Sequence, residues 1–232
     1  MSLFKETIGL LRKDFTLEFR LKYAISGIIL YVLSTVFIVY TSFANVEMEA
    51  VSWNALFWVV ILFAAVNAIG KSFILEKSER QLYYYIIANP IAVILSKMIY
   101  NIGLMLALSL LCWLGFSFVM ESPVQNLNIF IVGLLLGSVG FSIAFTFTSA
   151  IASKAQNSAT LMAILSFPII IPILLTLIKL SSSSLLTQEM MDRMGTAGDI
   201  NVAFQQDVTL LLAIDGLLIG MCLLLFPFLW RN

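Results

Sequence analysis

Long apolar runs separated by short polar stretches make up most of this chain. The runs cover approximately residues 23–42, 53–70, 91–119, 127–152, 158–179 and 208–230. A helix needs roughly 17–25 residues to cross the hydrocarbon of a bilayer, and every run falls within or above that range. The runs lack the alternating polarity of a transmembrane β-strand. The pattern therefore predicts an all-α integral membrane protein, a single domain over residues 1–232 with six transmembrane helices.

Residues 1–22 precede the first run and carry a helical pattern of apolar positions. Apolar side chains recur every three or four residues, with basic residues on the rest of the helix: Phe4, Ile8, Leu11, Phe15 and Phe19 against Lys5, Arg12, Lys13 and Arg20. This combination is typical of a helix that lies in the membrane interface. A soluble helix packed on a domain would show the same periodicity, but no soluble domain follows. We therefore expect an N-terminal amphipathic interfacial helix.

Lysine and arginine are distributed very unequally between the two sides of the predicted membrane. Of the 13 in the chain, all but Lys179 and Arg193 fall on the side that holds both termini and the stretch between residues 70 and 97. In membrane proteins the cytoplasmic loops carry the excess of positive charge. Both termini are therefore predicted to be cytoplasmic.

Composition narrows the chemistry that the chain itself can carry out. It is 61% hydrophobic and 11% charged, with a mean hydropathy of +1.02. The formal net charge is zero, which gives no electrostatic basis for binding nucleic acid. The chain has no histidine, which is the commonest metal ligand and general base. Cys112 and Cys222 lack C-x-x-C spacing and fit buried thiols. No catalytic residue, metal site or cofactor held by the chain's own residues is expected.

The stretch at residues 71–90 is a charged and aromatic interruption between two apolar runs. Asn89-Pro90 closes it, because the residue before a proline is pushed out of the helical region. We interpret residues 78–88 as a short cytoplasmic helix with an exposed tyrosine face. Tyrosine and arginine are favoured anchors at protein interfaces. We expect another protein to dock on the charged and aromatic side chains here: Glu76, Glu79, Arg80, Leu82, Tyr83, Tyr84 and Tyr85.

Gly70-Lys71-Ser72 resembles the end of a phosphate-binding P-loop. The full motif needs a glycine where this chain has Ala65, and it follows a β-strand, whereas this tripeptide ends a predicted membrane helix. Lys71 is better explained as a side chain that snorkels to the membrane surface. If the protein uses ATP, a separate chain must bind it.

Two prolines, Pro168 and Pro172, lie in the middle of the fifth run. Each removes a helical N–H and so frees the carbonyl four residues earlier, at Ile164 and at Pro168. We predict a kinked or locally unwound helix here. A static bend that aids packing and a mobile, gating element both fit the pattern.

Pairs of glycines four residues apart occur in the fourth and sixth runs. They are Gly133 and Gly137, followed by Gly140, and then Gly216 and Gly220. Small residues at this spacing let membrane helices approach closely. We predict helix packing at both pairs, with a substrate path as the alternative.

Asp215 is the only carboxylate inside a predicted span. A charge at the bilayer centre costs roughly 2.5–3.5 kcal/mol on insertion scales, so we expect Asp215 to face the bundle. Measured along its run, it should lie near the level of Gly133 and Gly137, somewhat above the carbonyls that Pro168 and Pro172 free. A structural bond and a role in transport both remain open.

The segment at residues 180–207 is the longest on the predicted outer side. Leu186, Met190 and Met194 recur at helical spacing, residues 195–198 break that helix, and Asp199 can cap a second helix that enters the last span. The pattern predicts a small helical flap on the outer surface. Its methionines fit apolar anchors better than ligands of a soft metal.

In its order of features the chain resembles the heme exporter protein B family, the permease of the cytochrome c maturation ABC transporter. The features are the N-terminal amphipathic helix, six spans, a Glu-rich loop that ends in a proline and Leu95-Ser96-Lys97, and Phe167-Pro168-Ile169-Ile170-Ile171-Pro172 in the fifth span. The resemblance implies an ABC-2-like permease bundle in a bacterial inner membrane. It also implies a separate ABC ATPase subunit, a heme-handling membrane subunit and, indirectly, a periplasmic heme chaperone. Heme would be a transported or partner-bound ligand.

The function expected from these features is that of a membrane permease subunit for heme export or delivery in c-type cytochrome biogenesis. Two alternatives share the topology. One is an ABC-2-type exporter of lipid or drug, which a lipid-sized cavity beside the fifth span would favour. The other is a non-transporting membrane scaffold for cytochrome assembly factors, whose role would survive an inactive ATPase. Few polar groups converge, so the chain is not expected to be an enzyme.

Overall fold

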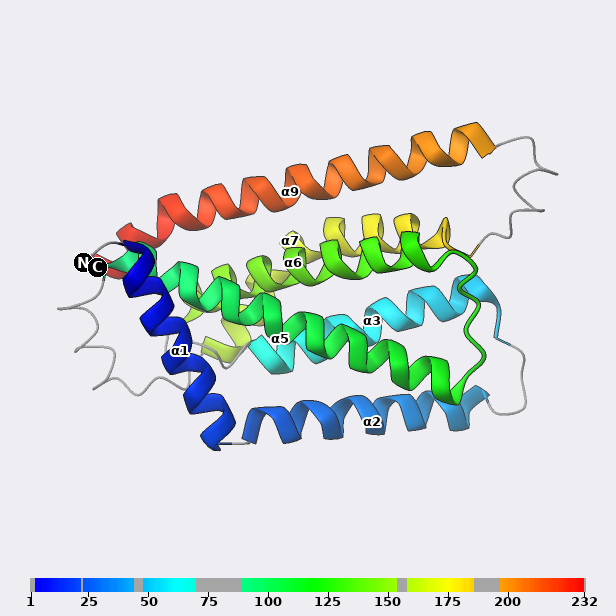
Figure 1. Ribbon diagram of the computed structural model, residues 1–232, viewed down its shortest axis with the longest axis horizontal. Coiled ribbons are helices and arrows are strands. Elements are labelled where there is room, and N and C mark those ends of the chain that lie inside the picture. Colours follow the sequence, from blue (N-terminus) through cyan, green and yellow to red (C-terminus); the bar gives the residue numbers. More distant parts are fainter. Residues whose placement is uncertain are drawn as a thin grey trace.

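The computed structural model describes residues 3–21, 23–43, 48–69, 89–153, 158–185 and 197–231. Over these ranges the chain is α-helical and contains no strand. Its helices are α1 (Leu3–Leu21), α2 (Tyr23–Phe43), α3 (Ala50–Ile69), α5 (Pro90–Val119), α6 (Leu127–Ala152), α7 (Ser158–Ser182) and α9 (Ala197–Arg231). The helices from α2 onward lie alongside one another, and α1 crosses the end of the bundle where both termini lie (Figure 1). The all-α prediction is confirmed.

Six of these helices are long and apolar enough to cross a membrane, which confirms the predicted number of spans. Most follow the predicted runs closely, but α9 does not. It is one continuous helix of 35 residues from Ala197, so the helix expected to enter the last span is present, but Gly198 and Asp199 lie in its first turn rather than before it. Gln205, Gln206 and Asp207 interrupt the apolar run in the sequence without interrupting the helix, because backbone hydrogen bonding does not require apolar side chains.

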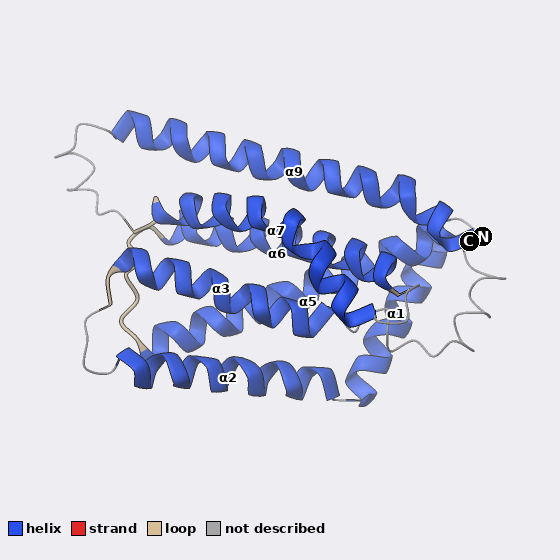
Figure 2. Cartoon of the chain, turned by 180° about the vertical axis from the view of Figure 1, so that it is seen from behind, coloured by secondary structure: helices blue, strands red, loops and turns tan. Residues whose placement is uncertain are grey.

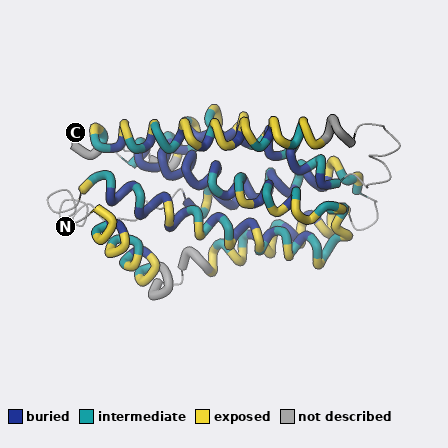
Figure 3. Tube along the Cα trace, turned by 45° about the horizontal axis from the view of Figure 1, so that its top comes forward, coloured by how far each residue is buried: buried dark blue, intermediate teal, exposed yellow. Residues whose placement is uncertain are grey.

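Burial differs sharply between the middle of the bundle and its edges. In the span of α6, 67% of the residues are buried, against 17% in α2 and 22% in α9. Figures 1 and 2 place α2 and α9 at opposite edges, with α6 between them. Figure 3 shows the same gradient, with the buried tube concentrated in the centre. The fold is organised around α6.

Aromatic rings fill the core at the end of the bundle opposite the termini. Trp53 and Phe57 of α3 stack with ring centroids 5.3 Å apart, and both meet Phe116 of α5 edge-on at 5.6 Å. Phe130 at the start of α6 adds a tilted contact with Phe57 at 5.4 Å. Stacked and edge-to-face pairs contribute about 0.5–1.5 kcal/mol each beyond their buried area. This aromatic cluster joins three spans.

Polar side chains join α5 to α6 within the membrane. The Asn101 side-chain amide donates to Thr146 Oγ1 at 2.8 Å, and Ser138 Oγ donates to Ser109 Oγ at 3.1 Å. Hydrogen bonds between membrane helices are worth about 0.6–1.7 kcal/mol each. The two bonds lie in opposite halves of α6, so they hold the helices together over much of their length.

A second polar group, which we call the outer fastening, holds α7 at the end of the bundle opposite the termini. The Asn54 side-chain amide donates to the Ile178 carbonyl at 2.8 Å, and the Trp58 indole N–H donates to Ser181 Oγ at 2.8 Å. Ser181 Oγ in turn donates to Asn54 Oδ1 at 2.7 Å. The backbone N–H groups of residues 125 and 126, before α6, both donate to the Ser184 carbonyl at 2.9 Å. The last turn of α7 is therefore bonded to α3 and to the α5–α6 loop.

Helix α1 is attached to the first turns of α5 by charged and aromatic contacts. Asp14 is 6% exposed, and its Oδ1 lies 3.4 Å from Lys97 Nζ. The next residue, Phe15, makes an edge-to-face contact with Tyr100, with ring centroids 5.2 Å apart. Because both members of the Asp14–Lys97 pair are buried, separating them would be costly. The pair fixes which side of α1 faces the bundle.

Candidate functional site

The predicted docking segment lies almost wholly outside the described residues, which resume at Asn89. All seven predicted contact residues, Glu76, Glu79, Arg80, Leu82, Tyr83, Tyr84 and Tyr85, fall in that gap and remain a prediction. The described edge of the segment is well defined. Asn89 caps α5 by accepting a bond from the Ile91 N–H at 3.0 Å, with Pro90 as the first helical residue. The Asn89 N–H itself donates to Glu6 Oε1 at 2.7 Å, which ties the end of the segment to α1.

Helix α7 runs without interruption through Pro168 and Pro172. The locally unwound helix that we considered is therefore absent from this structure. Both prolines are exposed, on a face shared with Ile164, which is 63% exposed, and Leu175, which is 61% exposed. The carbonyls that the prolines free consequently do not face the bundle centre. Whether α7 flexes at this point stays a prediction.

The glycines of α6 make room for large side chains of its neighbours. A Cβ at Gly137 would lie 2.7 Å from Trp58, and one at Gly133 would lie 3.1 Å from Leu180. Trp58 is fully buried and is bonded to Ser181 at the outer fastening. Gly133 and Gly137 thus lie where helices approach closely, as the small-residue spacing led us to expect.

The glycines of α9 differ from those of α6. A Cβ at Gly216 or Gly220 would meet nothing within 4 Å. Within this chain these two glycines therefore bring no helices together, and the predicted packing there could only involve another chain. The small-residue spacing alone does not say which helix faces are buried.

Asp215 is buried, with 3% of its surface exposed, and it faces the bundle as predicted. Its Oδ1 lies 2.7 Å from the position that a Cβ at Gly140 would take, and Ile173 of α7 lies 3.3 Å from the same position. The carboxyl is thus held between α9, α6 and α7 in a space that exists because residue 140 is a glycine. Neither carboxyl oxygen has a hydrogen-bond partner among the described residues.

The predicted level of Asp215 was wrong. Asp215 lies at Gly140, about one helical turn deeper than Gly137 and two turns deeper than Gly133, because the span of α9 begins at Asn201 and not at Val208. Its neighbour on α7 is Ile173, whereas the two prolines are exposed.

Sequence reasoning missed the Asp14–Lys97 pair and the outer fastening. The sequence does carry a signal for Asp14, because two polar residues seven positions apart, Thr7 and Asp14, lie on the same face of a helix. In the structure both are buried. Asn54 and Trp58 lie four residues apart near the start of a span, which places them on one face of α3. Neither signal identifies the partner helix.

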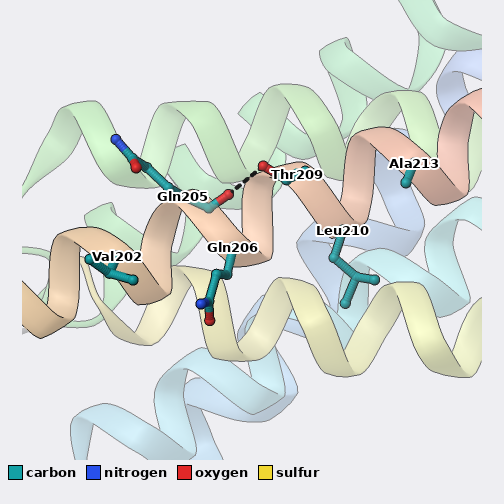
Figure 4. Close-up of a pocket in the computed structure, with 6 residues that line it drawn as sticks. All are labelled: Val202, Gln205, Gln206, Thr209, Leu210 and Ala213. Carbon is teal, nitrogen blue, oxygen red and sulfur yellow. Dashed lines mark hydrogen bonds between the residues drawn. The ribbon is translucent and has the colours of Figure 1, made fainter.

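Surface hollows among the described residues include two that are not lined by Asp215. One, of about 830 Å³, lies between α2 and α5 and is lined almost entirely by apolar side chains such as Leu33, Phe37 and Leu114. The other, of about 510 Å³, follows α9 from Val202 to Ala213. Figure 4 shows Gln205 and Gln206 on opposite sides of α9 there, with Thr209 Oγ1 donating to the Gln205 carbonyl at 2.7 Å. No cluster of cysteine and carboxylate ligands suited to a metal ion occurs in the described part of the chain.

Comparison with known proteins gives one match. The family described as CcmB protein matches residues 5–228, nearly the whole chain. No curated protein and no solved structure matches it.

Proposed function

The chain belongs to the CcmB protein family, a family of heme exporter permease components in cytochrome c biogenesis, and from this premise we propose that it is the membrane permease of an ABC complex for heme delivery. ATP is hydrolysed in a separate ATPase chain. A second membrane subunit handles heme, and a periplasmic chaperone receives it. The complex lies in a bacterial inner membrane with both termini of this chain in the cytoplasm.

The observation that carries the proposal is the family match over residues 5–228 together with six membrane-spanning helices. The termini, the end of α3 and the start of α5 lie at one end of the bundle (Figure 1). The excess of positive charge in the sequence supports a cytoplasmic position for that end.

The structure offers a route by which ATPase motion would reach the membrane. The docking segment ends at Asn89, whose N–H is bonded to Glu6 of α1. The chain then continues directly into α5, which crosses the membrane and is bonded to α6 through Asn101 and Thr146. Helix α6 in turn meets Asp215 of α9 at Gly140. A displacement of the segment would thus be passed from α5 to α6 and then to α9.

The docking site is tested by combining Tyr84→Ala with Arg80→Glu. We expect the ATPase to be lost from the purified complex while the permease still inserts, because two interface anchors are removed. Glu121→Ala is the matched control, since Glu121 is exposed in the loop between α5 and α6 at the other end of the bundle. Unchanged co-purification of the ATPase with the double variant would count against this docking site.

The scaffold alternative is separated by inactivating the partner ATPase. Heme attachment to a c-type cytochrome should stop if the complex uses ATP for delivery, and should continue if the chain only anchors assembly factors. A lipid-sized cavity beside the fifth span, α7, would have favoured the alternative function, export of lipid or drug. The larger described hollow lies instead between α2 and α5, so it gives that alternative no support.

A further inference from the structure

Helix α1 presents three distinct sides, and the Asp14–Lys97 pair identifies one of them. Thr7 and Asp14, 7% and 6% exposed, face α5. At 3.6 residues per turn, Phe4, Ile8 and Phe15 share a second side, about a quarter turn away. These three side chains are 72%, 47% and 41% exposed, although they are the most apolar part of the helix.

The third side carries the cations. Lys5 and Arg12 are seven residues apart and both are exposed, about a quarter turn beyond the apolar side and opposite the side that faces α5. Within the described residues neither takes part in an ion pair, whereas Lys13 is paired with Asp14 at 3.2 Å. Among the α1 side chains that the structure describes, Lys5 and Arg12 are thus available to an outside anion.

The attachment to α5 determines what each side meets. Because α1 crosses the end of a bundle of helices that are long and apolar enough to span a membrane (Figure 1), we expect its exposed apolar side to enter the boundary between headgroups and acyl chains. The cationic side then points away from the bundle at the level of the headgroups. Basic side chains at that level attract anionic lipid by about 1 kcal/mol each.

We propose that Lys5 and Arg12, beside the apolar side formed by Phe4, Ile8 and Phe15, make α1 a docking surface for anionic phospholipid headgroups. The ligand is a lipid in the membrane plane, since the apolar side chains must enter the bilayer for the cations to meet the headgroups. Because α1 is bonded to Asn89 and Lys97, the bound lipid also steadies the start of α5. The inference concerns lipid alone and stands whether or not the complex delivers heme.

The test measures amide hydrogen exchange of residues 3–17 in the full chain, reconstituted in nanodiscs. The discs contain either phosphatidylcholine alone or phosphatidylcholine with phosphatidylglycerol. We expect exchange in the wild type to slow by up to roughly 30-fold in the anionic discs, the factor that corresponds to two cations. The Lys5→Gln, Arg12→Gln double variant should lose this difference, and the charge-conserving Lys5→Arg, Arg12→Lys variant should keep it.

Two further arms separate the proposal from its alternatives. Lys13→Gln removes a cation from the same helix but from the side opposite the apolar residues, and it should leave the lipid dependence largely intact. Inorganic phosphate added to the phosphatidylcholine discs should not slow exchange. The proposal is overturned if the double glutamine variant keeps the lipid dependence, if Lys13→Gln abolishes it equally, or if free phosphate reproduces it.

Discussion

Two buried aspartates, Asp14 and Asp215, differ in whether their carboxyl groups have a charged partner. Asp14 is 6% exposed and Asp215 3%, so burial alone does not distinguish them. Asp14 lies on α1 and pairs with Lys13 at 3.2 Å and Lys97 at 3.4 Å. Asp215 lies within a span and has no partner for either oxygen among the described residues.

The difference separates a carboxyl that holds the fold together from one that the fold tolerates. Removing Asp14 would break its buried ion pair with Lys97, and breaking such a pair by removing one member is strongly destabilising. Removing Asp215 breaks no bond, so it should not destabilise the folded chain in this way. Asp215 is costly to insert and unbonded among the described residues, so a bond in another conformation is the hypothesis to test.

The largest effect is expected from Asp14→Ala, at about 3–5 kcal/mol of unfolding free energy, because a buried pair loses one member. Combining it with Lys97→Met removes the other charged member of the pair and should recover part of the loss. Reversible denaturation of the purified protein in mixed micelles measures both. Equal stability of the single and the double variant would show that the pair does not hold α1.

Asp215→Leu should make membrane insertion of α9 more favourable. The free energy of insertion should fall by about 3 kcal/mol on the biological scale. If Asp215 donates a bond in another conformation, the leucine variant should also lose heme delivery, while Asp215→Asn keeps a donor and most of the activity. Both are compared with wild type at equal membrane levels. Full activity of the leucine variant would make Asp215 a tolerated accident.

Gly140→Ala gives the smallest of the three effects, about 1–3 kcal/mol, because its Cβ would lie 2.7 Å from Asp215 Oδ1. The cost should fall when Asp215 is replaced by Ala in the same chain. Gly216→Ala is the control, since Gly216 adjoins Asp215 in sequence and its Cβ would meet nothing within 4 Å. An unchanged cost of Gly140→Ala beside Asp215→Ala would place the obstruction at Ile173 instead.

The sequence was sufficient for the elements of the fold because hydrophobic length alone determines whether a helix can span a bilayer. It was less reliable where polar residues lie within a helix. A helix was expected from Asp199 onward, but Gln205, Gln206 and Asp207 led us to begin the span at Val208, and that error moved Asp215 to the wrong level. The length of an apolar run depends on side-chain polarity, whereas the length of a helix depends on its backbone hydrogen bonds, so the two can end at different residues.

The contacts between helices could not be read from the sequence. Gly137 and Gly216 belong to the same spacing pattern, yet a Cβ at Gly137 would meet Trp58 and one at Gly216 would meet none of the described residues within 4 Å. Asp14 and Lys97 are 83 residues apart, and no periodicity connects them. Which faces meet depends on the relative rotation and tilt of two helices, and a pattern along one helix does not contain that information.

The outer fastening has a mechanical consequence for α7. Its last turns are hydrogen-bonded to α3 through Asn54 and Trp58. Among the described side chains between Thr160 and Thr176, the hydrogen bonds of α7, such as that from Thr176 Oγ1 to the Pro172 carbonyl at 2.8 Å, stay within the helix itself. Directional bonds to other elements are thus concentrated at the Ser181 end, and apolar packing holds the rest of α7. We therefore expect any displacement of α7 to be smallest at Ser181 and larger toward Thr160.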